Sequence, residues 1–346
     1  MHLLTSETDV FDRIPDPIVL LIFNHLSDIK SLIRCRAVSK RFNSLVLQAD
    51  NLVVKVDRVI SNETGEWSFL LHLLRSILQS LQDLISLRRL PIQPRNRNSP
   101  TEILRGFESI RRLVIELPAG DLRLEKDAVV RWRAEFGKTL KSCVIFAVRT
   151  IGEATDDGGG NGGDGDDMDF NGEDGGGGLK LRVVWTISAL IAASARHYLL
   201  RDVIREHREM ESLVLKDREE EGTMVMDKEG LREFREAAVE EEEEQEANQV
   251  NNRTVGWKNR TTVPAVRMRM MHEPRLDLPG GVRMKGATLV VVSPAAAQGQ
   301  GTETADDSAK ESEEQKLALD AFGGMFGEAA KALVKSRSYL LEMNSF

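Results

Sequence analysis

The chain of 346 residues is poor in cysteine. Cys35 and Cys143 are the two cysteines present, and they lie far apart in the sequence. A disulfide framework is therefore not expected, and a reducing compartment such as the nucleus or the cytoplasm fits this composition.

The chain also lacks a net positive charge and long uninterrupted apolar runs. The formal net charge of −8 argues against general binding to nucleic acid or to anionic membranes, which favour basic surfaces. The longest apolar stretches, Ile18–Phe23 and Val183–Ala195, are too short or too interrupted to span a bilayer. Met1–Val10 lacks the basic start and apolar run of a secretory signal. These features predict a soluble intracellular protein with neither a nucleic-acid nor a membrane partner.

The residue patterns of common enzymes are absent as well. The sequence holds no glycine-rich phosphate loop ending in Lys-Ser/Thr and no G-x-G-x-x-G after a strand. His197 and His207 are ten residues apart on an expected helix, so they lack the i, i+4 spacing of metal ligands and are interpreted as surface or boundary histidines. We therefore expect no catalytic residues, metal or cofactor.

What the chain does contain is a dense apolar segment at residues 11–49. Apolar residues at Ile18, Leu21, Ile22 and Leu26 recur at helical spacing. Asp16 is positioned to cap this first helix, with Pro17 in its first turn. Asp28 and Ser39 are positioned to cap a second and a third helix. Three short helices are predicted.

These helices are too apolar to bury all their faces among themselves, because modules of about 40 residues rarely hold enough core to stand alone. An exposed apolar remainder marks a protein interface. The segment therefore predicts a helical docking module. The alternative is an amphipathic hairpin that seals the end of the larger domain.

The same residues resemble the F-box family. IPDPIVLLIFNHL (Ile14–Leu26) is similar to the first half of an F-box, and VSKRFNSL (Val38–Leu45) is similar to the second half. Ile14, Pro17, Ser39 and Phe42 stand where the family more often has Leu, an acidic residue, Cys and Trp. The resemblance covers about an eighth of the chain.

The resemblance implies a non-catalytic substrate-recognition subunit of a Skp–cullin–F-box ubiquitin ligase. Its F-box would bind the Skp adaptor and, through it, a cullin, while the rest of the chain would bind an unknown protein target for ubiquitination and degradation. An alternative is a Skp-binding scaffold that acts without cullin. The residues that would contact the adaptor or hold the helices in the docking shape are Ile14, Pro15, Ile18, Leu21, Ile22, Leu26, Leu32, Val38 and Phe42.

The chain offers no means of transferring ubiquitin itself. Two cysteines and six histidines are too few for the eight zinc ligands of a RING-type ligase. Cys35 lies in an expected docking helix and Cys143 at an inward strand position, so neither is predicted to be an activated thiolate.

Residues 50–292 predict an irregular α/β region, which makes the whole chain α+β or α/β. Three segments share the L-x-x-L-x-L spacing of leucine-rich repeats, and fainter copies lie at Leu52–Val54 and Leu289–Val291. A degenerate repeat solenoid and a generic α/β domain both remain open. The three segments begin at Ile110, Leu140 and Met210.

Helices are expected at Ser68–Leu90, Glu125–Phe136 and Gln315–Leu341. Arg267–His272 is an alternating stretch expected to form a strand with one wet face. GGDGDDMDF (Gly162–Phe170) resembles a single calcium-binding nonapeptide but is interpreted as a spacer, because such repeats must stack. Arg88–Arg97 is interpreted as a solvated loop.

The chain divides into seven predicted parts. The Gly/Asp-rich insert, the acidic run Glu240–Glu246 and the stretch Ser293–Glu314 look disordered. The Gly/Asp-rich insert and the strand distribution are similar to a group of plant F-box proteins that includes the auxin up-regulated F-box proteins, which implies a regulatory role in growth or hormone response. The parts are a flexible N-terminus (1–10), the F-box (11–49), the first α/β part (50–151), a disordered Gly/Asp-rich insert (152–178), the second α/β part (179–292) with an acidic loop near 240–250, a disordered linker (293–314) and a C-terminal helix (315–346).

Overall fold

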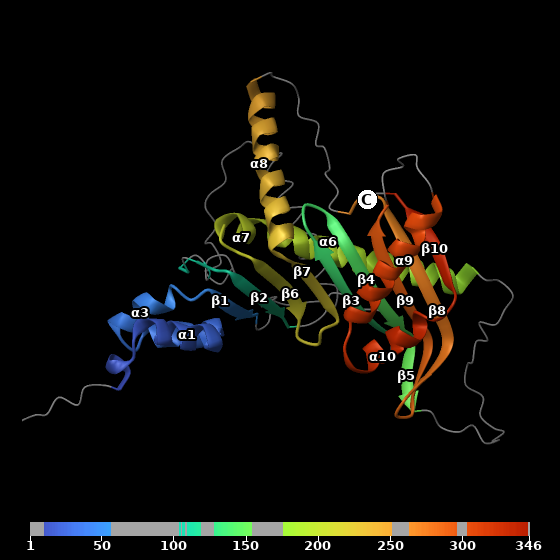
Figure 1. Ribbon diagram of the computed structural model, residues 1–346, viewed down its shortest axis with the longest axis horizontal. Coiled ribbons are helices and arrows are strands. Elements are labelled where there is room, and N and C mark those ends of the chain that lie inside the picture. Colours follow the sequence, from blue (N-terminus) through green and yellow to red (C-terminus); the bar gives the residue numbers. More distant parts are fainter. Residues whose placement is uncertain are drawn as a thin grey trace, which may run out of the picture.

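A computed structural model describes residues 10–56, 104, 106–107, 109–118, 128–153, 176–250, 263–295 and 303–344. Three helices begin the described chain, and an α/β body follows (Figure 1). The fold is therefore α+β, as predicted. The N-terminal elements are η1 (Val10–Arg13), α1 (Asp16–Leu26), α2 (Ile29–Arg36) and α3 (Lys40–Val46).

The body is built on one twisted sheet of ten described strands, in the order β1-β2-β6-β7-β3-β4-β9-β8-β10, with β5 paired to β9. The strands are β1 (Asn51–Lys55), β2 (Arg112–Leu117), β3 (Val129–Phe136), β4 (Leu140–Val148), β5 (Thr150–Glu153), β6 (Ser212–Asp217), β7 (Gly222–Met226), β8 (Val266–Leu278), β9 (Val282–Pro294) and β10 (Ser338–Met343). The remaining helices are α6 (Gly176–Leu199), α7 (Arg201–Glu206), α8 (Lys228–Val250), α9 (Glu303–Asp320) and α10 (Gly324–Leu333).

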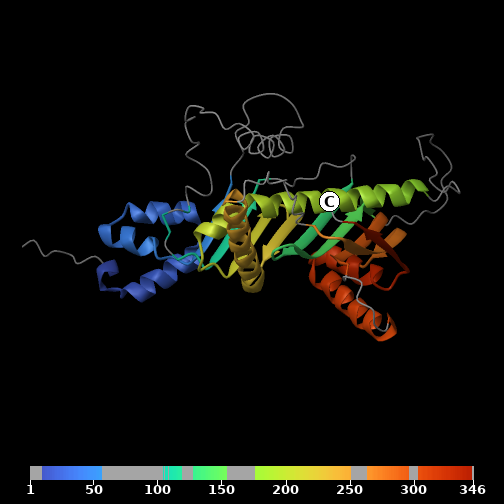
Figure 2. The same cartoon turned by 90° about the horizontal axis from the view of Figure 1, so that it is seen from above.

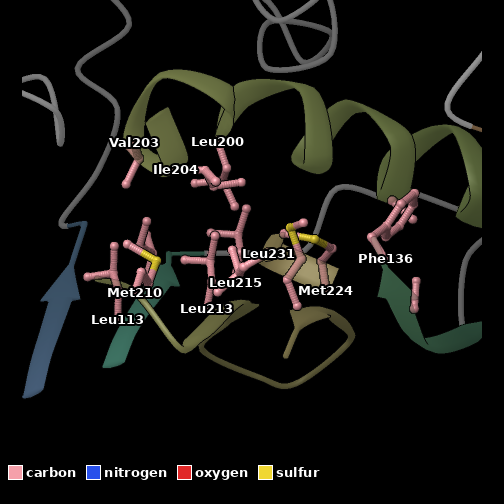
Figure 3. Close-up of a cluster of buried hydrophobic side chains, with 14 of the residues drawn as sticks. Leu113, Phe136, Leu200, Val203, Ile204, Met210, Leu213, Leu215, Met224 and Leu231 are labelled. Atoms are coloured by element: carbon pink, nitrogen blue, oxygen red, sulfur yellow. The ribbon is translucent and has the colours of Figure 1, made fainter. Parts of the chain in front are cut away.

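Helices cover the two faces of this sheet unequally. The long helix α6 runs along one face, whereas α9 and α10 lie on the other face near β4, β9 and β8 (Figure 2). Figure 3 shows Leu200, Val203 and Ile204 pointing toward Leu113 and Leu213 of the sheet. The main core is therefore a layer between the sheet and α6–α7.

The repeat-like spacing has a clear structural basis in three strands. β1, β2 and β6 are parallel neighbours, and Leu52, Leu113 and Leu213 are directly in register. The copy that begins at Leu140 lies in β4, separated from β2 by three strands, and β4 pairs antiparallel with β9. The leucine-rich-repeat interpretation therefore stays a prediction for the parallel strands and does not describe the antiparallel half.

Several predicted elements were wrong. Glu125–Phe136 contains a strand, β3, in which Val130, Trp132, Ala134 and Phe136 are buried and alternate with half-buried residues. Strict period-two burial of this kind is the pattern of a strand and not of a helix.

The predicted C-terminal helix is also not continuous. Its residues divide between the end of α9, the shorter helix α10 and the strand β10. α10 begins at Gly324, whose φ of 59° lies in the left-handed region that favours glycine. β10 pairs antiparallel with β8, so the chain ends in the sheet.

Three segments predicted to lack structure are at least partly helical. The acidic loop near 240–250 continues α8 to Val250, which fits the high helix propensity of glutamate. In the predicted linker 293–314, β9 extends to Pro294 and α9 begins at Glu303. Within the predicted insert 152–178, Gly152 and Glu153 belong to β5 and the residues from Gly176 belong to α6, while 154–175 lies outside the described residues.

Other predictions fall outside the described residues altogether. They are the N-terminus up to residue 9, the helix at Ser68–Leu90, the basic loop at Arg88–Arg97 and the nonapeptide-like stretch Gly162–Phe170.

The apolar stretch Val183–Ala195 belongs to a longer helix than its sequence predicted. Among the described helices, one segment (Gly178–Glu206) is long and apolar enough to cross a membrane by length and composition. Trp185, Ala189 and Ala193 within it are buried in the core layer. Packing against the sheet therefore accounts for its apolar inner face.

Candidate docking site

The helical module is held together by local caps at two of its three helices. The carboxylate of Asp28 accepts a hydrogen bond from the backbone N–H of Ser31 (3.0 Å), and the Ser39 hydroxyl accepts one from the N–H of Phe42 (3.1 Å). Hydrogen bonds from Ser31 lower the pKa of Asp28. Both predicted caps are thereby confirmed.

The cap predicted for the first helix was wrong. Pro15 occupies the N-cap position of α1, without a side-chain cap. The Asp16 carboxylate instead accepts a hydrogen bond from Nε of Arg41 in α3 (2.8 Å), and the Arg41 guanidinium also donates to the carbonyl of Phe11 (2.7 Å) and to that of Ile14. Arg41 therefore ties α3 to the start of α1, a role that its place in the sequence did not reveal.

The helix α1 is apolar on two sides, and the side identified from the sequence faces outward. Val19 and Phe23 are buried against α3 and the core, and the Phe23 ring meets Phe42 edge-on with centroids 5.3 Å apart. On the outer side the exposed fractions are 48% for Ile18, 65% for Leu21, 46% for Ile22 and 41% for Leu26. Such a row of large exposed apolar side chains on one helix is typical of an interaction surface.

The other predicted site residues divide between surface and core. Pro15 is exposed, Val38 is 68% exposed in the turn before α3, and Ile14 is partly buried against the core. Leu32 is fully buried and Phe42 is 8% exposed, so these two hold the helices together from inside. Sequence reasoning missed Ile33, which is 45% exposed on α2.

The module is joined to the sheet without a separate linker. The backbone N–H of Val53 in β1 donates to the carbonyl of Ser27 (2.9 Å), and Asp50 N–H donates to the side-chain oxygen of Asn24 (2.9 Å). Phe23 and Leu32 belong to the same buried cluster as Leu52 of β1. The three helices and the sheet therefore share one core.

His197, His207 and Cys143 are all buried. His197 is buried and stacks on Phe136, which corrects its interpretation as a surface or boundary residue, and burial lowers its pKa to about 4. Burial also raises the pKa of the Cys143 thiol. Within the ranges that the structure describes, no group of three His, Cys, Asp or Glu residues is placed to hold a metal ion.

The comparisons with known proteins agree with this geometry. The F-box-like family model matches residues 11–56, which contain the three helices and β1. The chain is 46% identical to the F-box protein AUF2 of Arabidopsis thaliana over 344 residues, covering 98% of this chain and all of that relative. It is 44% identical to the F-box protein AUF1 of the same plant over 360 residues, again covering 98% of this chain and all of the relative. No solved structure matches the chain.

The three N-terminal helices lie within the match to the F-box-like family model, which identifies a protein of the F-box class. Full-length similarity to AUF2 and AUF1 places the whole chain, including its sheet, in the F-box protein family.

Proposed function

We propose that this protein is the substrate-recognition subunit of a Skp–cullin–F-box ubiquitin ligase. The observation that carries the proposal is the exposed row Ile18, Leu21, Ile22 and Leu26 on α1. A water-exposed row of this size gains free energy when a partner covers it, at roughly 25 cal/mol for each Å² buried. In F-box proteins the partner expected here is the Skp adaptor.

The proposed mechanism is proximity. The adaptor bridges to a cullin and its charged ubiquitin-conjugating enzyme, and the sheet holds a target protein nearby. Holding both reactants on one scaffold raises their effective concentration without any chemical group from this chain. The same proposal includes three further statements. The chain is not catalytic, it reaches cullin through the adaptor, and it acts in the nucleus or the cytoplasm.

The test is a pull-down of purified Skp adaptor by the wild-type chain and by Leu21→Asp and Ile22→Asp variants. Both positions are exposed, so the substitutions should leave the fold intact, while a carboxylate buried in the interface without a partner should weaken binding at least about a hundredfold. Val239→Asp is the matched control, because Val239 is an exposed apolar residue on a helix away from the module. Equal capture by all four folded proteins would refute the adaptor site.

A scaffold that binds the adaptor without cullin is the alternative. The two functions differ in one observable result: cullin co-purifies through the adaptor with a ligase subunit but not with such a scaffold. Adaptor binding without any cullin would favour the scaffold.

A further inference from the structure

The sheet has one face that the described helices leave open. The main core lies on the α6 face and takes alternate residues from every strand of the main path except β10, including Leu52, Leu113, Leu213, Met224 and Trp132. On the opposite face, the second core involves β4, β9 and β8 beneath α9 and α10. Figure 1 shows β2, β6 and β7 facing the viewer with no described helix in front.

A row of four valines crosses this open face. Val53, Val114 and Val214 are in register across the parallel strands β1, β2 and β6, and Val214 pairs with Val225 of β7. All four are half-buried, between buried neighbours that point into the α6 layer. The row continues to Glu135 of β3. Four neighbouring strands thus present one continuous apolar strip.

Charged residues line this strip, and cations dominate. The open-face positions of β1, β2, β6 and β3 hold five cationic side chains and two carboxylates, an excess of three positive charges on a chain whose net charge is −8. The cations are Lys55, Arg112, Lys216, Arg131 and Arg133, and the carboxylates are Glu116 and Glu135.

One side of the open face is bounded by α10. The Arg131 guanidinium lies 4.2 Å from the centre of the Phe326 ring, where β3 meets that helix. Glu116 lies 3.9 Å from the ammonium of Lys55 and 3.9 Å from that of Lys216, and Lys216 also pairs with Glu220 at 3.3 Å. Arg112 is exposed and Arg133 is half-buried. The face is therefore apolar along its middle, and cationic side chains outnumber carboxylates at the strand positions around it.

We propose that this open face, named here the valine face (Val53, Val114, Val214 and Val225 with their flanking cations), is the target-binding surface. Its occupant is a protein segment that combines aliphatic and acidic side chains. Aliphatic groups would cover the valines, and carboxylates would meet Arg112, Lys216 and Arg133, since complementary charge selects partners and speeds encounter. The proposal rests on the proposed function, because it assigns the surface that recognises the substrate.

The experiment measures binding of three 12-residue fluorescent peptides to the full-length chain in complex with the Skp adaptor. One peptide alternates leucine and aspartate, the second alternates leucine and lysine, and the third alternates serine and aspartate. We expect the leucine-aspartate peptide to bind more tightly than either of the others, because the valine face requires both apolar contact and negative charge.

The decisive variant is Arg112→Glu/Arg133→Glu, which should weaken binding of the leucine-aspartate peptide about tenfold or more. The control Lys180→Glu/Arg208→Glu makes the same change in net charge at two exposed positions outside the valine face and should bind as the wild type does. Equal losses in both variants, equal binding of the lysine peptide, or no binding by the wild type would overturn the proposal.

A third variant, Val214→Asp, tests whether the valine face binds a second copy of this chain and not a target protein. If the wild-type chain self-associates in sedimentation experiments and Val214→Asp abolishes that association, the valine face binds a second copy and the proposal fails. All variants should still capture the Skp adaptor. If the wild-type chain binds the adaptor but not the leucine-aspartate peptide, only the valine-face proposal is refuted. If the wild-type chain does not bind the adaptor, the proposed function is refuted.

Discussion

Arg196 of α6 and Asp217 of β6 form a buried ion pair, with Nη2 and Oδ2 3.2 Å apart and side chains 2% and 0% exposed. The guanidinium also donates to the carbonyl of Gly222 (2.6 Å) and lies over the ring of Trp132. Asp217 accepts further hydrogen bonds from the backbone N–H groups of Glu221 and Gly222, each at 2.6 Å. The pair thus fixes the long helix against the turn between β6 and β7.

Asp217→Ala should lower the free energy of unfolding by about 3–5 kcal/mol, because it leaves the Arg196 charge buried without its partner. Urea unfolding followed by circular dichroism measures the change. Glu328→Ala removes one side of an exposed pair with Lys331 and should cost less than about 1 kcal/mol. Equal costs for the two variants would contradict the structural role of the buried pair.

His197 should make stability depend on pH. Its Nε2–H donates to the carbonyl of Gly137 (3.1 Å), and burial lowers its pKa from 6.5 to about 4. The unfolded chain therefore binds more protons between these values, so stability is complete above about pH 6.5 and falls as the pH approaches 4. The loss from this residue should reach about 3 kcal/mol.

His197→Phe should reduce that loss, as measured by urea unfolding between pH 7 and pH 4. Phenylalanine keeps the contacts with the rings of Phe136 and Phe234. His25→Phe, at an exposed position on α1, is the matched control. An unchanged pH dependence in His197→Phe would show that other groups cause it.

Leu32→Ala and Leu21→Ala should distinguish the buried core of the docking module from its exposed apolar row. Leu32 is fully buried, so its truncation should cost about 2–5 kcal/mol of stability. Leu21 is 65% exposed, so the same truncation there should change stability by less than about 0.5 kcal/mol while weakening adaptor capture. Thermal unfolding and adaptor binding, measured on both variants, test this division. Similar melting temperatures would contradict it.

Glu314→Gln should loosen α9. The buried Glu314 carboxylate accepts hydrogen bonds from Nε of Arg269 (2.7 Å), Nη2 of Arg267 (3.4 Å) and the hydroxyl of Ser293 (3.1 Å). Removing its charge takes away the nearest carboxylate of Arg269 and weakens a contact that ties α9 to β8, although Glu311 of α9 stays 3.4 Å from the Arg269 guanidinium. Hydrogen exchange should speed up in α9 and α10 but not in α6, whereas Glu313→Gln, at the exposed neighbouring position, should change neither. Unchanged exchange in α9 would exclude this anchoring role.

Glu314 also explains why Arg267–His272 was misjudged. The alternation of arginine and methionine predicted a strand with one wet face. The strand is present, but Arg269 is 9% exposed because α9 supplies a carboxylate above it. Nothing in the residues near Arg269 signals a partner 45 positions away. Local periodicity therefore predicted the strand but not the helix α9 that covers Arg269.

The docking module was predictable for the opposite reason, since its contacts are local. The capping side chains of Asp28 and Ser39 lie three residues before the backbone N–H groups that donate to them. Apolar spacing identified the outer row of α1, but the assignment of inside and outside required the packing of Phe23 on Phe42. The order of strands in the sheet depends on pairings between distant segments, such as Leu113 with Leu213, and spacing alone does not specify these.

The hydrogen bond from Val53 to Ser27 makes the first strand of the sheet a direct continuation of the docking helices. No hinge separates the two within residues 10–56, and the valine row begins at the residue that makes this bond. A target seated on the sheet would therefore sit at a fixed angle and distance from the adaptor. Which of its lysines comes within reach of the conjugating enzyme would then be decided by the shape of this protein, rather than by a search through linker conformations.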